Sequence, residues 1–275
     1  MSTRAELADV VTGPFWQIGC GNMGGAMLRR WLAAGLEPAR VTIVDPSEPM
    51  ADAGLTVLAA PPADGAAPAI VLLAVKPQLL DVVAPALAPL LAPETLLVSI
   101  LAGVELAALR ARFAAPRTIL RAMPNTPVAI GRGVVGLCGE GLDGERRDRA
   151  EALMAPLGLV EWVDEALFDV VTALGGSGPA FLFRFVDALA AAGADAGLDG
   201  DQAARMALAT ISGAAALAAG ASESPAVLAD RVASPGGSTR RGLDVLDEPS
   251  ALRALLRETL DAAILRNREM AAAAR

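Results

Sequence analysis

The chain has 275 residues, enough for two domains and a sizeable core. Its net charge of -8 and its pI of about 4.7 argue against a nucleic-acid surface, and no apolar run reaches the roughly 20 residues of a spanning helix. Histidine and tyrosine are absent and there are only two cysteines, which excludes a Ser-His-Asp triad, histidine-based zinc sites and a disulfide framework.

The first 13 residues include acidic side chains and lack the apolar core of a secretory signal. We therefore expect a cytoplasmic protein with no membrane or nucleic-acid partner and no metal site. Its chemistry must depend on carboxylates, hydroxyls, backbone dipoles, a lysine or a cofactor.

An apolar strand-like run, Phe15–Ile18, leads into glycines spaced G-x-G-x-x-G, and helix-forming residues follow from Ala26. The order of strand, glycine turn and helix is typical of dinucleotide-binding folds. In such folds Gly19 permits the tight turn, Gly21 a close approach to pyrophosphate, and Gly24 the packing of helix on strand. The predicted pyrophosphate turn comprises Gly19, Cys20, Gly21, Asn22, Met23 and Gly24. The alternative is an ordinary strand–turn–helix.

A second strand, Val41–Val44, ends at Asp45, about 20 residues past the last glycine. A carboxylate at that distance is the expected ligand of a ribose in a dinucleotide. The alternative is an Asp45 that faces solvent.

The alternation of strands and helices continues to residue 163. Further strands are expected at Leu55–Ala59, Ala69–Val75, Leu96–Ile100, Thr118–Met123, Gly133–Cys138 and Leu159–Val163, and further helices at Leu79–Leu91, Val104–Arg112 and Arg146–Leu157. This pattern predicts an α/β Rossmann-type, doubly wound and mostly parallel sheet over residues 1–163.

Ligands of such sheets bind beyond the carboxyl ends of the strands, so two more turns are candidates for cofactor contact. One turn holds Ala74, Val75, Lys76 and Pro77, and the other holds Ala102. Lys76 is the only lysine among 23 basic residues, which suggests that a compact point charge is needed there.

After Asp164 the pattern becomes entirely helical. Helices are expected at Phe168–Leu174, Pro179–Gly193, Gln202–Ala219, Pro225–Val232 and Ser250–Ala274. Alanine and leucine occupy more than one face of the long helices, which favours a homo-oligomer over a monomeric helical domain. We expect an all-α domain over residues 164–275.

The loop Ser234–Thr239 joins two of these helices through small residues, S-P-G-G-S-T. The N–H groups of Gly237, Ser238 and Thr239 would begin a helix and form an anion site for a carboxylate or phosphate. The alternative is a helix-capping turn.

Five motifs, in order and similarly spaced, resemble pyrroline-5-carboxylate reductases. They are G-C-G-N-M-G from Gly19, A-V-K-P from Ala74, R-A-M-P-N-T-P from Arg121, G-S-G-P-A from Gly176, and S-P-G-G-S-T from Ser234. The resemblance covers residues 15 to 270 and implies a Rossmann-type domain followed by a helical dimerisation domain. It implies reduction of 1-pyrroline-5-carboxylate to L-proline by NAD(P)H, as the last step of proline synthesis.

The resemblance also implies site residues. Cofactor contacts fall on the glycine turn, Asp45, Ser47, Ala74, Val75, Lys76, Pro77 and Ala102, and substrate contacts on Ser234, Gly236, Gly237, Ser238 and Thr239. Thr239 matches the family threonine whose hydroxyl lies near the ring nitrogen, so it is the catalytic candidate.

Some positions depart from the family pattern. Ser238 stands where a threonine is usual, Ser224 replaces the histidine of a His-Pro pair, and Ala229 replaces a common lysine. NADP-using members usually carry Ser or Thr at the end of the second strand, where this chain has Asp45, with Ser47 two residues on. Because a carboxylate repels a 2′-phosphate, we expect NADH to be preferred to NADPH.

The expected chemistry does not need a histidine. A protonated imine accepts hydride readily, so the enzyme would act mainly by positioning nicotinamide against imine carbon. Three alternatives remain open: a reductase of another cyclic imino acid, a nucleotide-binding regulatory protein without turnover, and a 3-hydroxyacid dehydrogenase. The last requires a lysine that Pro179–Gly193 lacks.

Overall fold

The computed structural model describes residues 7–47 and 54–273, so the expectation about a leader segment falls partly outside the described residues. The chain forms two compact units. The sheet unit comprises Met1–Ser177 and Ala263–Arg275, and the helical unit comprises Gly178–Ala262.

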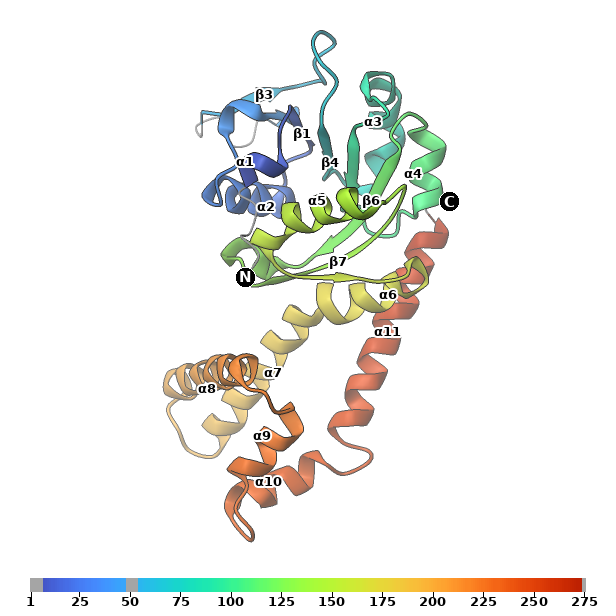
Figure 1. The fold of residues 1–275 in the computed structure, drawn as a ribbon. Helices are drawn as coiled ribbons and strands as arrows, with labels where there is room; N and C mark the ends of the chain where they lie inside the picture. Colours follow the sequence, from blue (N-terminus) through green and yellow to red (C-terminus); the bar gives the residue numbers. More distant parts are fainter. Residues whose placement is uncertain (1–6, 48–53, 274–275) are drawn as a thin grey trace. The chain divides into compact units, whose positions relative to one another are not determined.

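The sheet unit is built on eight strands in the order β3-β2-β1-β4-β5-β6-β7-β8 (Figure 1). Their bounds are β1 Phe15–Ile18, β2 Val41–Val44, β3 Thr56–Leu58, β4 Ile70–Leu73, β5 Leu96–Ser99, β6 Thr118–Pro124, β7 Gly133–Glu140 and β8 Gly158–Trp162. Every pairing is parallel except β6 with β7. The chain moves outward from β1 to β3 and returns to β4 beside β1, which confirms the predicted Rossmann-type winding.

The continuous apolar runs of the sequence form strands in the centre of the sheet. Strands β1, β4 and β5 are buried at every position because helices cover both faces of the sheet. On one face Phe15 packs edge-on against Trp31 of α2, with the ring centroids 5.5 Å apart. On the other face Trp16 belongs to a cluster with Leu87 of α3.

The helices of the sheet unit match the expected positions, apart from a short N-terminal helix that the pattern did not predict. They are α1 Leu7–Val10, α2 Asn22–Ala33, α3 Leu80–Leu87, α4 Leu106–Arg112, α5 Gly144–Met154 and α6 Phe168–Val171. The proline-containing segment around α3 is helical as predicted, with a 3₁₀ turn at each end, η3 Pro77–Leu79 and η4 Ala88–Leu90.

The helical unit has little apolar core of its own. Its helices are α7 Gly178–Asp195, α8 Gly200–Gly220, α9 Pro225–Val232, α10 Ser238–Leu246 and the first part of α11 Leu252–Ala273. No residue of α7 is buried, and α8 buries only Ala203 and Ala207.

Large apolar side chains of this unit, such as Phe183 and Leu217, are about two-thirds exposed. By length and composition alone, Glu165–Asp195 and Gly200–Gly220 could each cross a membrane. These apolar faces therefore call for a covering partner.

Candidate active site

In the turn after β1, the first and last glycines are required by close packing, and the middle glycine borders empty space. Gly19 has φ of +88°, and a Cβ there would lie 2.8 Å from the Ala74 carbonyl oxygen. A Cβ on Gly24 would lie 3.0 Å from both the Ala74 Cβ and the Gln17 Nε2. Gly21 has no atom within 4 Å of the position of a Cβ, so its backbone faces free space that a ligand can enter.

A hollow of about 560 Å³ opens beside this turn at the carboxyl ends of β1, β2 and β4, where the strand order reverses. Six of the predicted cofactor residues line it: Gly19, Gly21, Asp45, Ala74, Val75 and Lys76. Apolar side chains of α3, including Val82 and Val83, line another part of its wall. Gly21 begins α2 without a side-chain cap, so the first N–H groups of that helix are available to an anion.

The Asp45 carboxylate is held at the rim of this hollow by three hydrogen bonds. Its Oδ2 accepts from the Cys20 N–H at 2.8 Å, and its Oδ1 accepts from the Ser47 N–H at 2.9 Å and the Ser47 hydroxyl at 2.7 Å. Burial raises the pKa of the Asp45 carboxyl, but the bonds from Ser47 and Cys20 outweigh it and leave the pKa below its ordinary value. Asp45 is therefore a charged carboxylate at neutral pH.

Of the seven predicted cofactor residues that do not line this hollow, two line another one in the sheet unit. Pro77 and Ala102 line a separate hollow of about 640 Å³, bordered also by α4 and the end of α11. The charged side chains that line this second hollow form ion pairs with one another: Arg112 pairs with Asp81 at 2.6 Å and Arg266 with Glu269 at 2.7 Å.

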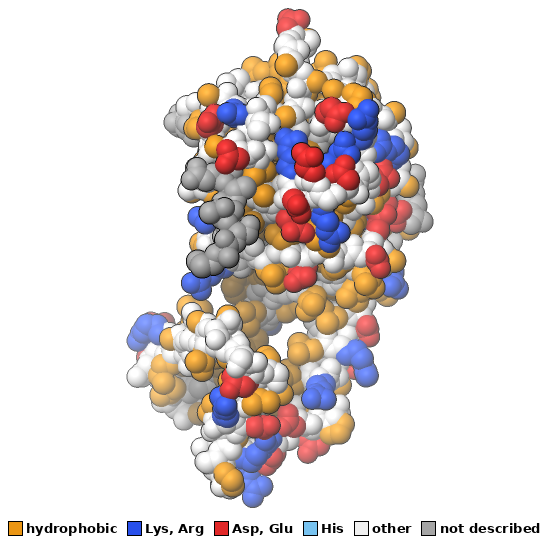
Figure 2. Space-filling view, viewed as in Figure 1, with side chains coloured by type: hydrophobic (Ala, Val, Ile, Leu, Met, Phe, Trp, Pro, Cys, Tyr) orange, Lys and Arg blue, Asp and Glu red, His pale blue; other side chains and the backbone are white. Residues whose placement is uncertain are grey.

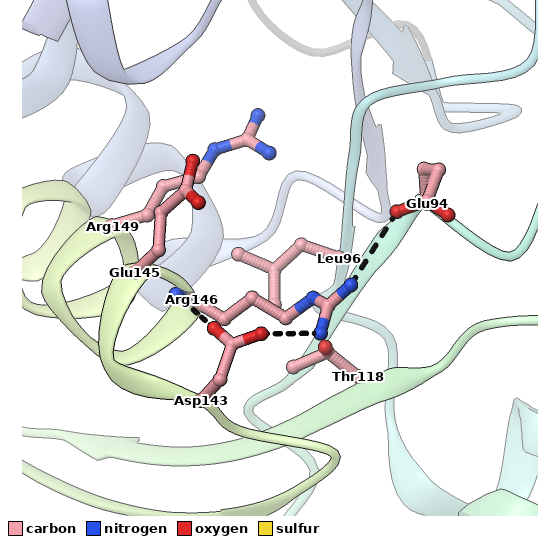
Figure 3. A pocket seen from close by; sticks show the side chains of 7 residues that line it. All are labelled: Glu94, Leu96, Thr118, Asp143, Glu145, Arg146 and Arg149. Atoms are coloured by element: carbon pink, nitrogen blue, oxygen red, sulfur yellow. Dashed lines mark hydrogen bonds and ion pairs between the residues drawn. The ribbon is translucent and has the colours of Figure 1, made fainter.

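A smaller hollow of about 220 Å³ lies at the amino ends of β5 and β6, the edge of the sheet opposite the glycine turn (Figure 3). Arg146 occupies it and pairs with Asp143 at 2.7 Å and with Glu94 at 3.5 Å. Asp143 also caps α5 by accepting from the Arg146 N–H. Glu94 also pairs with Arg117 at 2.6 Å, so these four charges are compensated, and none of the predicted site residues lines this hollow.

Three buried polar residues without a predicted role make hydrogen bonds inside the sheet unit. Gln17 is fully buried in β1, and its Nε2 donates to the Gly19 carbonyl at 3.1 Å. Arg121 lies on β6 and Asn125 directly follows that strand; both are described below. A polar side chain inside an otherwise apolar strand, as in F-W-Q-I, was the available signal for Gln17.

The loop Ser234–Thr239 of the helical unit ends in an uncapped helix start. Gly236 has φ of +72°, and the Gly237 N–H donates to the Ser234 carbonyl at 3.0 Å, so that N–H closes the turn. A Cβ on Gly237 would lie 2.6 Å from the Ser234 Oγ and 3.1 Å from the Ser234 carbonyl oxygen, so a larger residue would require the Ser234 side chain to move. Helix α10 then starts at Ser238 without a side-chain cap, and its first N–H groups have no intrahelical acceptor. The N–H groups of residues 238–240 are therefore available to an anion, whereas the predicted set is Gly237, Ser238 and Thr239.

Arg240, the residue after the threonine, already has its charge compensated. Its guanidinium pairs with Asp247 at 2.7 Å, Asp244 at 2.9 Å and Asp230 at 3.2 Å. Asp230 lies on α9, so this ion pair links the two helices on either side of the loop. An anion bound to the loop would depend mainly on backbone N–H groups.

Comparison with known proteins covers both units. Residues 165–270 match the family described as pyrroline-5-carboxylate reductase dimerisation, and residues 17–103 match NADP oxidoreductase coenzyme F420-dependent. A pyrroline-5-carboxylate reductase of Pseudomonas aeruginosa is 37% identical over 92% of this chain and 95% of its own length. One of Pisum sativum is 35% identical over 96% of this chain and 97% of its own.

Solved structures of pyrroline-5-carboxylate reductases are also similar to this chain. The structure of a pyrroline-5-carboxylate reductase from Coxiella burnetii has a TM-score of 0.85 and 32% identity, covering 94% of this chain and 98% of that one. The Plasmodium falciparum pyrroline carboxylate reductase, solved with NADP bound, has a TM-score of 0.80 at 24% identity, covering 95% and 99%, which shows the shared fold.

Proposed function

The chain belongs to the pyrroline-5-carboxylate reductase family, and we propose that it reduces 1-pyrroline-5-carboxylate to L-proline with a nicotinamide dinucleotide, as the last step of proline biosynthesis. The observation that carries this proposal is that the relationship extends over both units, each of which offers one candidate half-site. One half is the open glycine turn with Asp45, and the other is the uncapped start of α10.

We assign cofactor binding to residues 1–163 and substrate binding and dimerisation to residues 164–275, whereas the compact units divide after Ser177 and residues 263–275 belong to the sheet unit. The Gly21 backbone and the start of α2 would hold the pyrophosphate, with Lys76 as the nearby cation. The apolar wall formed by α3 suits the flat face of an adenine. We also assign cofactor contacts to Pro77 and Ala102, for the part of a dinucleotide that extends beyond the hollow beside the glycine turn.

In the helical unit, the free N–H groups of residues 238–240 would bind the substrate carboxylate. The bound dinucleotide supplies the hydride, and this chain supplies orientation. We assign the Thr239 hydroxyl to the imine nitrogen, where it would orient the ring and could relay a proton. A basic imine takes its proton readily, which fits a chain without histidine or tyrosine.

We infer a preference for NADH from Asp45. Its carboxylate is charged and lies on the wall of the hollow, where one acceptor position and the Ser47 hydroxyl remain for ribose hydroxyls. A 2′-phosphate at the same place would meet a like charge.

The exposed apolar helices support self-association through the helical unit. Figure 2 shows apolar side chains on the visible face of this unit. The ion pair Arg184–Asp187 is strongly exposed on α7, which favours a protein partner over lipid at this surface. A second copy is thus the proposed cover, in a cytoplasmic homodimer or larger homo-oligomer.

The decisive experiment follows NADH and NADPH oxidation with 1-pyrroline-5-carboxylate, beside six-membered cyclic imines and 2-carboxylate imines. We expect the highest kcat/KM with 1-pyrroline-5-carboxylate. A higher value with another ring would favour the alternative imino-acid reductase. Dinucleotide binding without turnover of any imine would favour a regulatory protein.

A further inference from the structure

Residues 165–177, here called the connector, lead from the last strand to the end of the sheet unit, and α7 of the helical unit begins at Gly178. The last part of the connector, η8 Thr172–Gly176, is a π-helical turn. The Ser177 N–H donates to the Thr172 carbonyl five residues back, at 2.9 Å. Such turns are rare and occur frequently at functional sites.

Arg121 of β6 and Asn125, directly after β6, hold the connector at its two ends. At the start, Arg121, which is 5% exposed, donates to the Glu165 carboxylate at 2.6 Å and stacks over the Phe168 ring at 4.3 Å. At the end, the Asn125 Nδ2 donates to the Gly175 carbonyl at 2.9 Å.

The Asn125 amide is fixed on both sides. It is 6% exposed, and its Oδ1 accepts from the Val134 N–H at 2.9 Å, which leaves only its Nδ2 to face Gly175. The carbonyl of Gly175 cannot accept an α-helical hydrogen bond, because the residue four positions on is Pro179, which has no N–H. Asn125 therefore supplies a side-chain donor to a carbonyl that lacks its α-helical partner.

We propose that Asn125 is a positioning residue for hydride transfer. Both ends of its side-chain amide are bonded within the sheet unit, so it acts through the backbone of the π turn, from which the chain enters the unit that carries Ser234–Thr239. This inference rests on the proposed function, in which the sheet unit binds the hydride donor and the helical unit the acceptor. Reacting atoms must approach to roughly 3–3.5 Å, and a misplacement of about 1 Å can cost on the order of 100-fold in rate.

The test uses Asn125→Asp, which keeps the shape and the bond to Val134 but loses the donor, and Asn125→Ala. The matched control is Thr118→Val at the first residue of β6. Thr118 is also buried and also donates to a glycine carbonyl, that of Gly141 at 3.0 Å, but at the opposite end of β6. All three variants should lose similar thermal stability.

We expect kcat with 1-pyrroline-5-carboxylate to fall at least about tenfold in both Asn125 variants, while the Kd for NADH stays within about twofold. Thr118→Val should keep its kcat. Hydrogen exchange of the peptide that contains residues 172–178 should accelerate in the Asn125 variants alone.

An unchanged kcat in the Asn125 variants, or an equal fall in Thr118→Val, would overturn the proposal. So would a failure of both Asn125 variants to fold while Thr118→Val folds, because Asn125 would then be structural. An inactive wild-type protein would instead refute the proposed function. Hydrogen exchange would still test whether Asn125 holds the connector.

Discussion

Replacing Asp45 by asparagine should shift the cofactor preference of this protein toward NADPH. Asparagine has nearly the shape of aspartate and removes the charge that a 2′-phosphate would meet at the rim of the hollow. The variant also weakens the bonds to Cys20 and Ser47, so binding of both cofactors should fall. The informative quantity is therefore the ratio of kcat/KM for NADPH to that for NADH.

The size of the shift follows from Coulomb's law. Two unit charges at about 4 Å interact by about 1 kcal/mol in water and about 4 kcal/mol at an effective dielectric constant of about 20. Asp45 is only partly buried, so the lower half of that range applies. About 2 kcal/mol corresponds to a ratio change of about 30-fold.

The assay compares steady-state rates with both cofactors in the wild type, Asp45→Asn and a control, Asp143→Asn. Asp143 lies at the amino ends of the strands, and asparagine can still cap α5 there, so its cofactor ratio should not change. Raising the salt concentration should reduce the difference between wild type and Asp45→Asn. An unchanged ratio in Asp45→Asn, or an equal change in the control, would refute the assignment.

Three further predictions concern the helical unit and the core. Thr239→Ala should lower kcat/KM for the imine by at least about tenfold with the Kd for NADH unchanged, since the hydroxyl acts on the substrate; equal turnover would remove that role. Phe183→Asp should shift the protein toward monomers in sedimentation, whereas Ile130→Asp, an equally exposed apolar position in the sheet unit, should not. Burial raises the pKa of the Cys138 thiol from 9.0 to about 12, so the unfolded thiol ionises first and stability falls as the pH rises between these values. Urea unfolding at pH 8 and pH 10.5 should therefore show a steeper loss in wild type than in Cys138→Ala, by about 1.4 kcal/mol per pH unit above 9.

Local sequence patterns were enough for most of the fold. Runs such as Ile70–Leu73 are apolar at every position because helices bury both faces of the strand. Gly19 and Gly24 could be recognised because the tight turn and the close packing of α2 each require the absence of a Cβ. Asp45 could be placed because it directly follows the strand beside β1.

Contacts between distant residues decided the rest. The pattern could not reveal that the Gly237 N–H is taken by Ser234, or that Ala102 lines a different hollow from Gly19. Nor could it show that Asn125 and Gly175, 50 positions apart, share a hydrogen bond. Hydrophobic periodicity indicates which face of a helix or strand is buried, and a glycine can indicate where the backbone is too crowded for a Cβ. The partner of a buried polar group depends on which strand and turn the fold brings beside it, so only the tertiary structure could identify Asn125 as the donor to Gly175.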